Sequence, residues 1–130
     1  MADDEPFNIS ALLGIMRVLG LKNADELVDT CYHGQNLVDY VKKAVEEDDY
    51  QRYSLILTDC QMPIMDGYEA VNQVRELLGE KVQEVKIIAI TGHVEAEYLK
   101  KAHDCGINQV YAKPFPVGEL ALILQDLNFI

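Results

Sequence analysis

The chain of 130 residues contains no tryptophan, and its 11 lysine and arginine residues are half as many as its 22 aspartate and glutamate residues. The formal net charge of −11 argues against binding to nucleic acid or to an anionic membrane surface, since both require a basic face. No apolar run is long enough for membrane insertion, and the N-terminal MADDEPFN has no secretory signal. An acidic surface suits a protein partner or a cation, although by itself it indicates only solubility.

Cysteine is also scarce. Cys31, Cys60 and Cys105 are odd in number and show no CxxC spacing, which argues against a disulfide framework or a zinc site. We therefore expect reduced thiols and a cytoplasmic location. The length predicts a single domain, residues 1–130, that is large enough to build its own core.

Two hydrophobic periodicities alternate along the chain. Apolar residues at helical spacing predict five helices, whereas short apolar runs predict strands between them. The predicted helices are 9–20, 36–45, 68–79, 95–106 and 117–127, and the predicted strands are 26–32, 54–59, 85–91 and 107–114. This alternation is typical of an α/β fold with a parallel sheet covered by helices on both faces.

Polar residues stand where three of the predicted strands end. Asp59 follows SLILT, Thr91 follows VKIIAI and Lys113 follows INQVYA, while DD at 3–4 precedes the first helix. Alone, such a threonine is usually a helix cap, such a lysine is usually solvated, and the two acids could be a ragged terminus. The carboxyl ends of parallel strands meet in one crevice, however, so we expect these side chains to converge.

Four stretches carry a resemblance to a known family. DDEPFN, LILTDCQMPIMDGYEA, IIAITGH and YAKPF resemble the receiver domain of two-component response regulators, and DCQMPIMDG is most similar to receivers of hybrid histidine kinases. The resemblance covers nearly the whole chain. It implies a flavodoxin-like, doubly wound parallel sheet of strand order 2-1-3-4-5.

The resemblance also implies the roles of individual residues. Asp59 matches the phosphoacceptor, Thr91 the hydroxyl residue and Lys113 the lysine that accompany it. Tyr111 matches the aromatic ring that switches together with Thr91, although by pattern alone it would more often be a core residue. Lys113-Pro114 resembles the family's cis peptide, and Gln61 and His93 occupy positions that tune dephosphorylation.

A magnesium site is implied as well. Asp3 and Asp4 match the family's acidic pair. Mg²⁺ takes oxygen ligands in near-octahedral geometry and keeps several waters, so a few carboxylates and one carbonyl suffice. We expect Asp4, Asp59 and the backbone carbonyl of Gln61 to be direct ligands, with Asp3 acting through water.

The function favoured by these residues is that of a phosphoacceptor in a histidine-to-aspartate relay. The partners would be a histidine kinase or a histidine phosphotransfer domain, and helices 95–106 and 117–127 would carry the output. Such a receiver phosphorylates and dephosphorylates itself, so it is not a conventional enzyme. The resemblance also allows tethering to a membrane-bound hybrid kinase.

Two alternatives belong to other function classes. A receiver that takes no phosphate would act only as a docking module. A hydrolase of the haloacid dehalogenase type also attacks from a strand-end aspartate, but it carries a second aspartate where this chain has Gln61.

The N-terminus departs from the receiver pattern. Receivers have an apolar strand before the acidic pair, and this chain offers only Met1 and Ala2. We therefore expect the first strand to be largely missing, as in a receiver domain truncated at its N-terminus.

Overall fold

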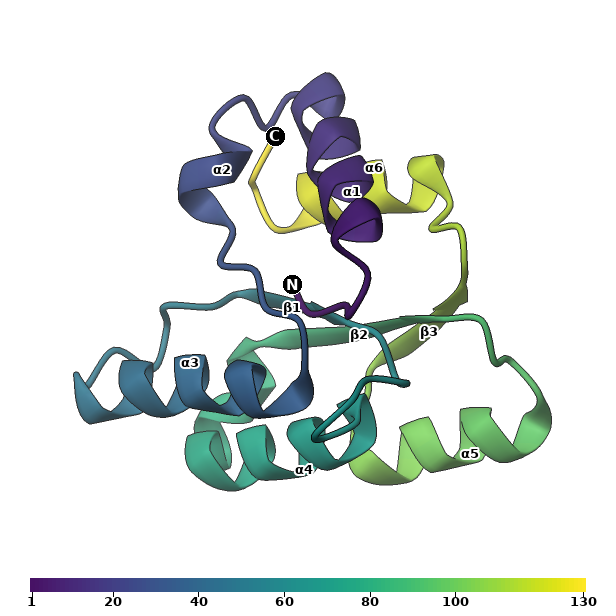
Figure 1. The fold of residues 1–130 in the computed structure, drawn as a ribbon. Coiled ribbons are helices and arrows are strands. Elements are labelled where there is room, and N and C mark those ends of the chain that lie inside the picture. The colour runs from purple at the N-terminus through teal and green to yellow at the C-terminus, as the bar shows by residue number, and fades with distance from the viewer.

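Three parallel strands form the centre of the structure, a computed structural model that describes residues 1–130 (Figure 1). They are β1 (Leu55–Thr58), β2 (Lys86–Thr91) and β3 (Gln109–Ala112), in the order β1-β2-β3. The central strand β2 is almost fully buried. Since residues at Ile87 to Ala89 face both helical layers, their continuous apolar character is the pattern of a strand covered on two sides.

Helices cover both faces of this sheet (Figure 1). On one face lie α1 (Pro6–Leu19), α2 (Ala24–Leu27) and α6 (Val117–Asp126). On the other lie α3 (Gly34–Glu46), α4 (Gly67–Leu78) and α5 (Ala96–Cys105), with a short 3₁₀ helix, η1 (Gly79–Glu84), after α4. The doubly wound α/β architecture is therefore confirmed, whereas η1 has no counterpart among the predicted elements.

The five predicted helices all form, and each packs buried apolar residues against the rest of the fold, although in α1 only Ile9 and Met16 of the predicted stripe are fully buried. In α6, for example, Leu120, Ile123 and Leu124 are buried as the periodicity predicts. Gly106 ends α5 with φ 94°, a left-handed conformation that favours glycine. None of the helices is both long enough and apolar enough to span a membrane.

The prediction of a strand at residues 26–32 is wrong. Residues Ala24–Leu27 form the helix α2, and Cys31 alone makes a β-bridge. A strand needs a neighbour to satisfy its backbone groups, and here the only neighbour on that side is the short segment Met1–Asp3. The apolar run therefore has too little backbone to pair with.

Ala2 lies between Cys31 and β1. It forms parallel bridges with Cys31 and with Thr58, its N–H donates to the Leu57 carbonyl at 2.8 Å, and its carbonyl accepts from the Asp59 N–H at 2.8 Å. In the expected strand order 2-1-3-4-5, Cys31 lies at the position of strand 2, and β1 of this structure lies at the position of strand 3. Ala2, between them, therefore occupies the position expected for strand 1. The pairing also brings the acids that follow Ala2 to the carboxyl edge of the sheet.

Candidate active site

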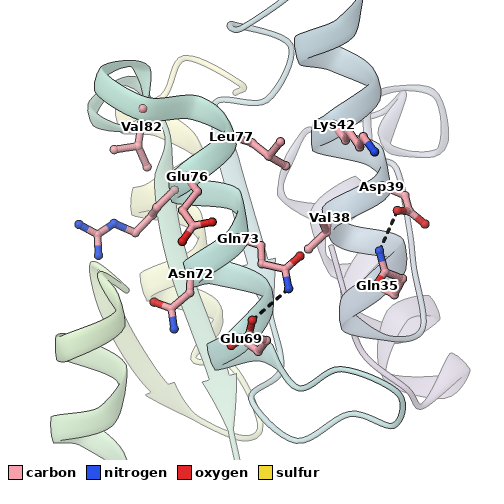
Figure 2. Close-up of a pocket in the computed structure, with 12 residues that line it drawn as sticks. Gln35, Val38, Asp39, Lys42, Glu69, Asn72, Gln73, Glu76, Leu77 and Val82 are labelled. Carbon is pink, nitrogen blue, oxygen red and sulfur yellow. Dashed lines mark hydrogen bonds between the residues drawn. The ribbon is translucent and has the colours of Figure 1, made fainter.

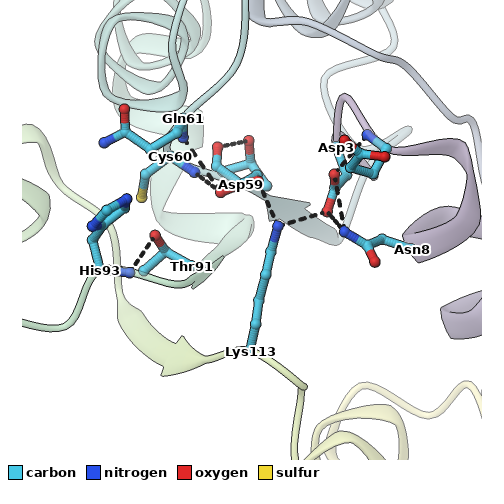
Figure 3. Close-up of polar contacts among 10 residues, drawn as sticks. Asp3, Asn8, Asp59, Cys60, Gln61, Thr91, His93 and Lys113 are labelled. Atoms are coloured by element: carbon cyan, nitrogen blue, oxygen red, sulfur yellow. Dashed lines mark hydrogen bonds and ion pairs between the residues drawn. The ribbon is translucent and has the colours of Figure 1, made fainter.

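Asp59 follows β1 directly and is 6% exposed. Its Oδ1 accepts hydrogen bonds from the backbone N–H groups of Cys60 at 2.7 Å and Gln61 at 3.3 Å. Its Oδ2 accepts from Nζ of Lys113 at 2.6 Å (Figure 3). A buried carboxylate is costly unless it is paired and hydrogen-bonded, and these contacts meet both conditions.

Lys113 reaches the site from the loop after β3, where its bond to Pro114 is cis as expected. Its ammonium also lies 3.2 Å from Oδ2 of Asp3, so one cation bridges two carboxylates. Burial alone would lower the pKa of Lys113, but hydrogen bonds and charge attraction from Asp59 and Asp3 outweigh it and leave that pKa raised. The lysine is therefore held in its charged form.

Three carboxylates gather at this edge of the sheet. Ligand oxygens of Asp3, Asp4 and Asp59 all lie within 4.8 Å of one another. Asp3 is 8% exposed and is fixed by the Glu5 N–H at 2.9 Å and the Asn8 side-chain amide at 3.3 Å, whereas Asp4 is exposed. Since Lys113 supplies the one ammonium in contact with them, the cluster has an excess of negative charge and only oxygen donors. This donor set fits Mg²⁺ or a similar hard cation.

Thr91 ends β2 and is buried. Its Oγ1 accepts a hydrogen bond from the His93 N–H at 3.1 Å (Figure 3). Because that bond uses a lone pair of the oxygen, the hydroxyl proton stays available for a further acceptor. Gly92, which comes next, is exposed, so its backbone is accessible from solvent.

Tyr111 lies on β3 with its ring half-buried and stacked on Phe115, at a centroid distance of 4.9 Å. Its hydroxyl lies 3.4 Å from a Gln109 oxygen and 3.5 Å from a Glu119 oxygen, and it makes no hydrogen bond with Thr91. The structure thus brings Asp3, Asp4, Asp59 and Lys113 together and leaves Tyr111 turned to a different set of partners.

Two contributions to the site were not identified from the sequence. Asn8 clamps Asp3 from the first turn of α1, and the backbone N–H groups of Cys60 and Gln61 hold Asp59. The spacing of Asn8 from the acidic pair, about one helical turn, was the available signal. Backbone donors have no signal in the side-chain pattern.

A larger hollow of about 900 Å³ lies elsewhere, between α3 and α4 (Figure 2). Its walls carry acids, bases and amides together, among them Asp39, Lys42 and Glu76, and none of the predicted site residues. A smaller cavity of about 310 Å³ adjoins Asp59 and Lys113, and its walls are mostly apolar. Chemistry rather than size therefore places the candidate site at the strand ends.

Known proteins with similar sequences support the resemblance to receiver domains. The family described as "Response regulator receiver domain" matches residues 1–125. Hybrid signal transduction histidine kinase C of Dictyostelium discoideum is 32% identical over 127 residues, which are 95% of this chain and 9% of that protein. Two-component response regulator 24 of Arabidopsis thaliana is 30% identical over 129 residues, 99% of this chain and 82% of that protein. The chain thus spans less than a tenth of the Dictyostelium kinase.

Solved structures agree with the fold. The receiver domain of a Pseudomonas aeruginosa sensor histidine kinase, described with a magnesium ion in its active site cleft, is 31% identical with a TM-score of 0.74, and the match covers 96% of this chain and 91% of that one. The receiver domain of an Arabidopsis thaliana histidine kinase has a TM-score of 0.78 at 24% identity, over 97% and 88% of the two chains, and shows the same fold. The chain belongs to the family of response regulator receiver domains.

Proposed function

We propose that Asp59 is the phosphoacceptor of this receiver domain and takes its phosphoryl group from a phosphohistidine. The observation that carries the proposal is the position of Asp59: a buried carboxylate at a strand end, bonded to Lys113 and within ligand distance of two further acids. Nothing in an ordinary core needs three carboxylates at one point, whereas phosphoryl transfer to a carboxylate does need a cation there.

The transfer exchanges one bond for another. A carboxylate oxygen of Asp59 attacks phosphorus, a P–O bond forms, and the P–N bond of the phosphohistidine breaks with its electron pair going to the imidazole. The product is an aspartyl phosphate. Lys113 offsets the charge on the incoming oxygens, and Thr91 can donate its hydroxyl proton to one of them. Catalysis is then a matter of positioning and charge stabilisation.

Mg²⁺ fits the acidic cluster in a specific way. Asp3 is committed to Lys113, Asn8 and the Glu5 N–H, which leaves it suited to act through water. Asp4 is exposed and free to bind directly, together with Asp59 and the Gln61 carbonyl. When bound, the ion would neutralise the carboxylates and the phosphoryl oxygens. The Pseudomonas receiver with magnesium in its cleft supports this assignment.

The donor would be a histidine kinase or a histidine phosphotransfer domain, since the relatives of this chain include histidine kinases. We place the reaction in the cytoplasm because all three cysteines are unpaired thiols in the structure. Thr91 and Tyr111 would then form the switch, with the Tyr111 ring leaving Glu119 when Asp59 is phosphorylated.

Acetyl phosphate and Mg²⁺ provide the test. Intact mass should rise by one phosphoryl group in the wild type and in the control Asp39→Asn, whose carboxylate is exposed on α3, but not in Asp59→Asn. Equal labelling of Asp59→Asn and wild type would move the acceptor elsewhere. If the wild type took phosphate neither from acetyl phosphate nor from a phosphorylated histidine donor, the result would favour a receiver that acts only as a docking module.

A further inference from the structure

The loop that leads from Asp59 into α4, residues 60–66, is tied by its own backbone. The Gly67 N–H donates to the Cys60 carbonyl at 3.0 Å and closes the base of the loop. At the tip, the Met65 N–H donates to the Pro63 carbonyl at 2.7 Å, around Ile64 with φ 68°. This is the rarer, positive-φ form of the γ-turn, and it is strained for a β-branched residue. Such a turn persists only where its surroundings hold it.

Gly34, in the first turn of α3, contacts the loop and holds it in this conformation. Its N–H donates to the Met65 carbonyl at 2.8 Å. A Cβ on Gly34 would lie 2.3 Å from that carbonyl oxygen, 2.8 Å from the Met65 carbonyl carbon and 2.9 Å from the Asp66 oxygen. These are backbone atoms, which cannot swing aside as the end of a side chain can. Any side chain at Gly34 would therefore push the loop and α3 apart.

The helix side of this contact is well anchored. His33 caps α3, with its Nδ1 accepting from the Asn36 N–H at 3.2 Å, and Leu37 is buried in the core. The loop side has an exposed tip, since Ile64 is 80% exposed. The displacement would thus fall mainly on the loop rather than on α3.

Gln61 connects this loop to the metal site. It lies between the bonded carbonyl of Cys60 and the γ-turn, and its N–H points to Oδ1 of Asp59 at 3.3 Å. A shift of the loop turns the Gln61 peptide and with it the carbonyl that would bind Mg²⁺. We propose that Gly34 is a positioning residue for magnesium binding, because its N–H and its missing side chain fix the loop that presents Gln61; this inference rests on the metal site proposed above.

Calorimetric titration of MgCl₂ into Gly34→Ala provides the test. Partners behind a metal ligand typically change metal affinity by about 10–100-fold, so we expect the Kd for Mg²⁺ to rise at least about tenfold. The matched control is Gly118→Ala, since a Cβ at Gly118 has no atom within 4 Å and should leave the Kd unchanged. Circular dichroism would verify that each variant is folded at the titration temperature. Equal Kd values for Gly34→Ala and wild type would reduce Gly34 to a packing role.

A second measurement needs no variant. If Mg²⁺ binds the conformation that the Gly34 N–H holds, then Mg²⁺ must suppress opening of that bond, because the two equilibria are linked. Hydrogen exchange of the wild-type Gly34 amide should slow at saturating Mg²⁺, while the buried amide of Ile88 in β2 serves as the reference. An unchanged Gly34 rate with Mg²⁺ bound would overturn the proposal. A wild type that binds no Mg²⁺ would instead overturn the metal site itself.

Discussion

Oδ2 of Asp59 and Nζ of Lys113 lie 2.6 Å apart although the two residues are 54 positions apart in the chain. The lysine is therefore a counter-ion of the buried Asp59 carboxylate. Because Lys113 also contacts Asp3, it holds the two most buried acids of the site against each other's repulsion. A divalent cation at Asp4 and Asp59 would share this task.

Removing the ammonium tests that relationship. Lys113→Met should lower the metal-free stability by about 1–3 kcal/mol, since two carboxylates lose their partner in a site of low exposure. Saturating Mg²⁺ should restore more stability to this variant than it adds to wild type, because the ion then faces uncompensated charge. Thermal melts with and without Mg²⁺ measure both effects. Lys100→Met is the control, since its pair with Asp104 is exposed and contributes little.

Asp4 should contribute to the affinity for Mg²⁺ but not to the stability of the metal-free fold. Asp4→Asn removes a charge from an exposed residue of the acidic cluster, so the metal-free melting temperature should stay the same or rise slightly as repulsion is relieved. The Kd for Mg²⁺ should rise at least about tenfold, and labelling by acetyl phosphate should fall with it. As a control, Glu5→Gln removes a charge from the next residue, which lies outside the cluster. It should change neither the Kd for Mg²⁺ nor the labelling by acetyl phosphate. Equal Mg²⁺ affinity in Asp4→Asn and wild type would show that the metal site is misplaced.

Alkaline pH should weaken the fold through Cys60. Burial of this thiol raises its pKa from an ordinary 9.0 to about 11, with the Tyr68 hydroxyl acting in the opposite direction. The folded state therefore favours the neutral thiol, and this contribution is complete below pH 9 and is lost as pH rises toward 11. The loss is on the order of 2 kcal/mol. Urea unfolding of wild type and Cys60→Ala between pH 8 and pH 11 should show a shallower decline for the variant. Parallel curves would contradict the assignment to Cys60.

The sequence was sufficient for the helices and for the position of Asp59 because their signals are local. The apolar run SLILT and the stripe of α6 each bury themselves in the way their period predicts. Convergence of Asp59 and Lys113 was also predictable, since a parallel sheet brings the ends of its strands to one edge. Family resemblance then supplied roles that spacing alone could not.

Other features depend on partners that no local pattern reveals. Residues 26–32 have strand-like composition, but a strand forms only beside a neighbour, and the neighbour here is little more than Ala2. Gly34 looks like an ordinary helix start in the sequence; its role arises from a carbonyl 31 residues away. The Tyr111 orientation depends on Glu119 and Phe115, which meet it only in the folded structure.

Mostly apolar side chains surround the space next to Met1. The Met1 amine donates to the Asp29 carbonyl at 2.9 Å, and burial lowers its pKa because the charged form loses solvent. Two mostly apolar cavities open beside it, one on each face of the sheet, and both also contact Tyr53 and Leu55. The first is further lined by Met16, Leu21, Leu124 and Phe129, and the second by Leu37, Val41 and Ile56.

An extended segment joined to Met1 would run between Asp29 and Leu55, and its alternate side chains would enter the two cavities. It would also replace the Met1 amine with a peptide group. Adding about four alternating valine and leucine residues should bury at least two side chains, worth about 3 kcal/mol or more. At roughly 3 °C per kcal/mol, the melting temperature should rise by about 10 °C. A glycine–serine extension of equal length should give little change, since it fills neither cavity. If the proteins with either extension melted at the same temperature as the 130-residue chain, the added segment would not pair as a strand between Asp29 and Leu55.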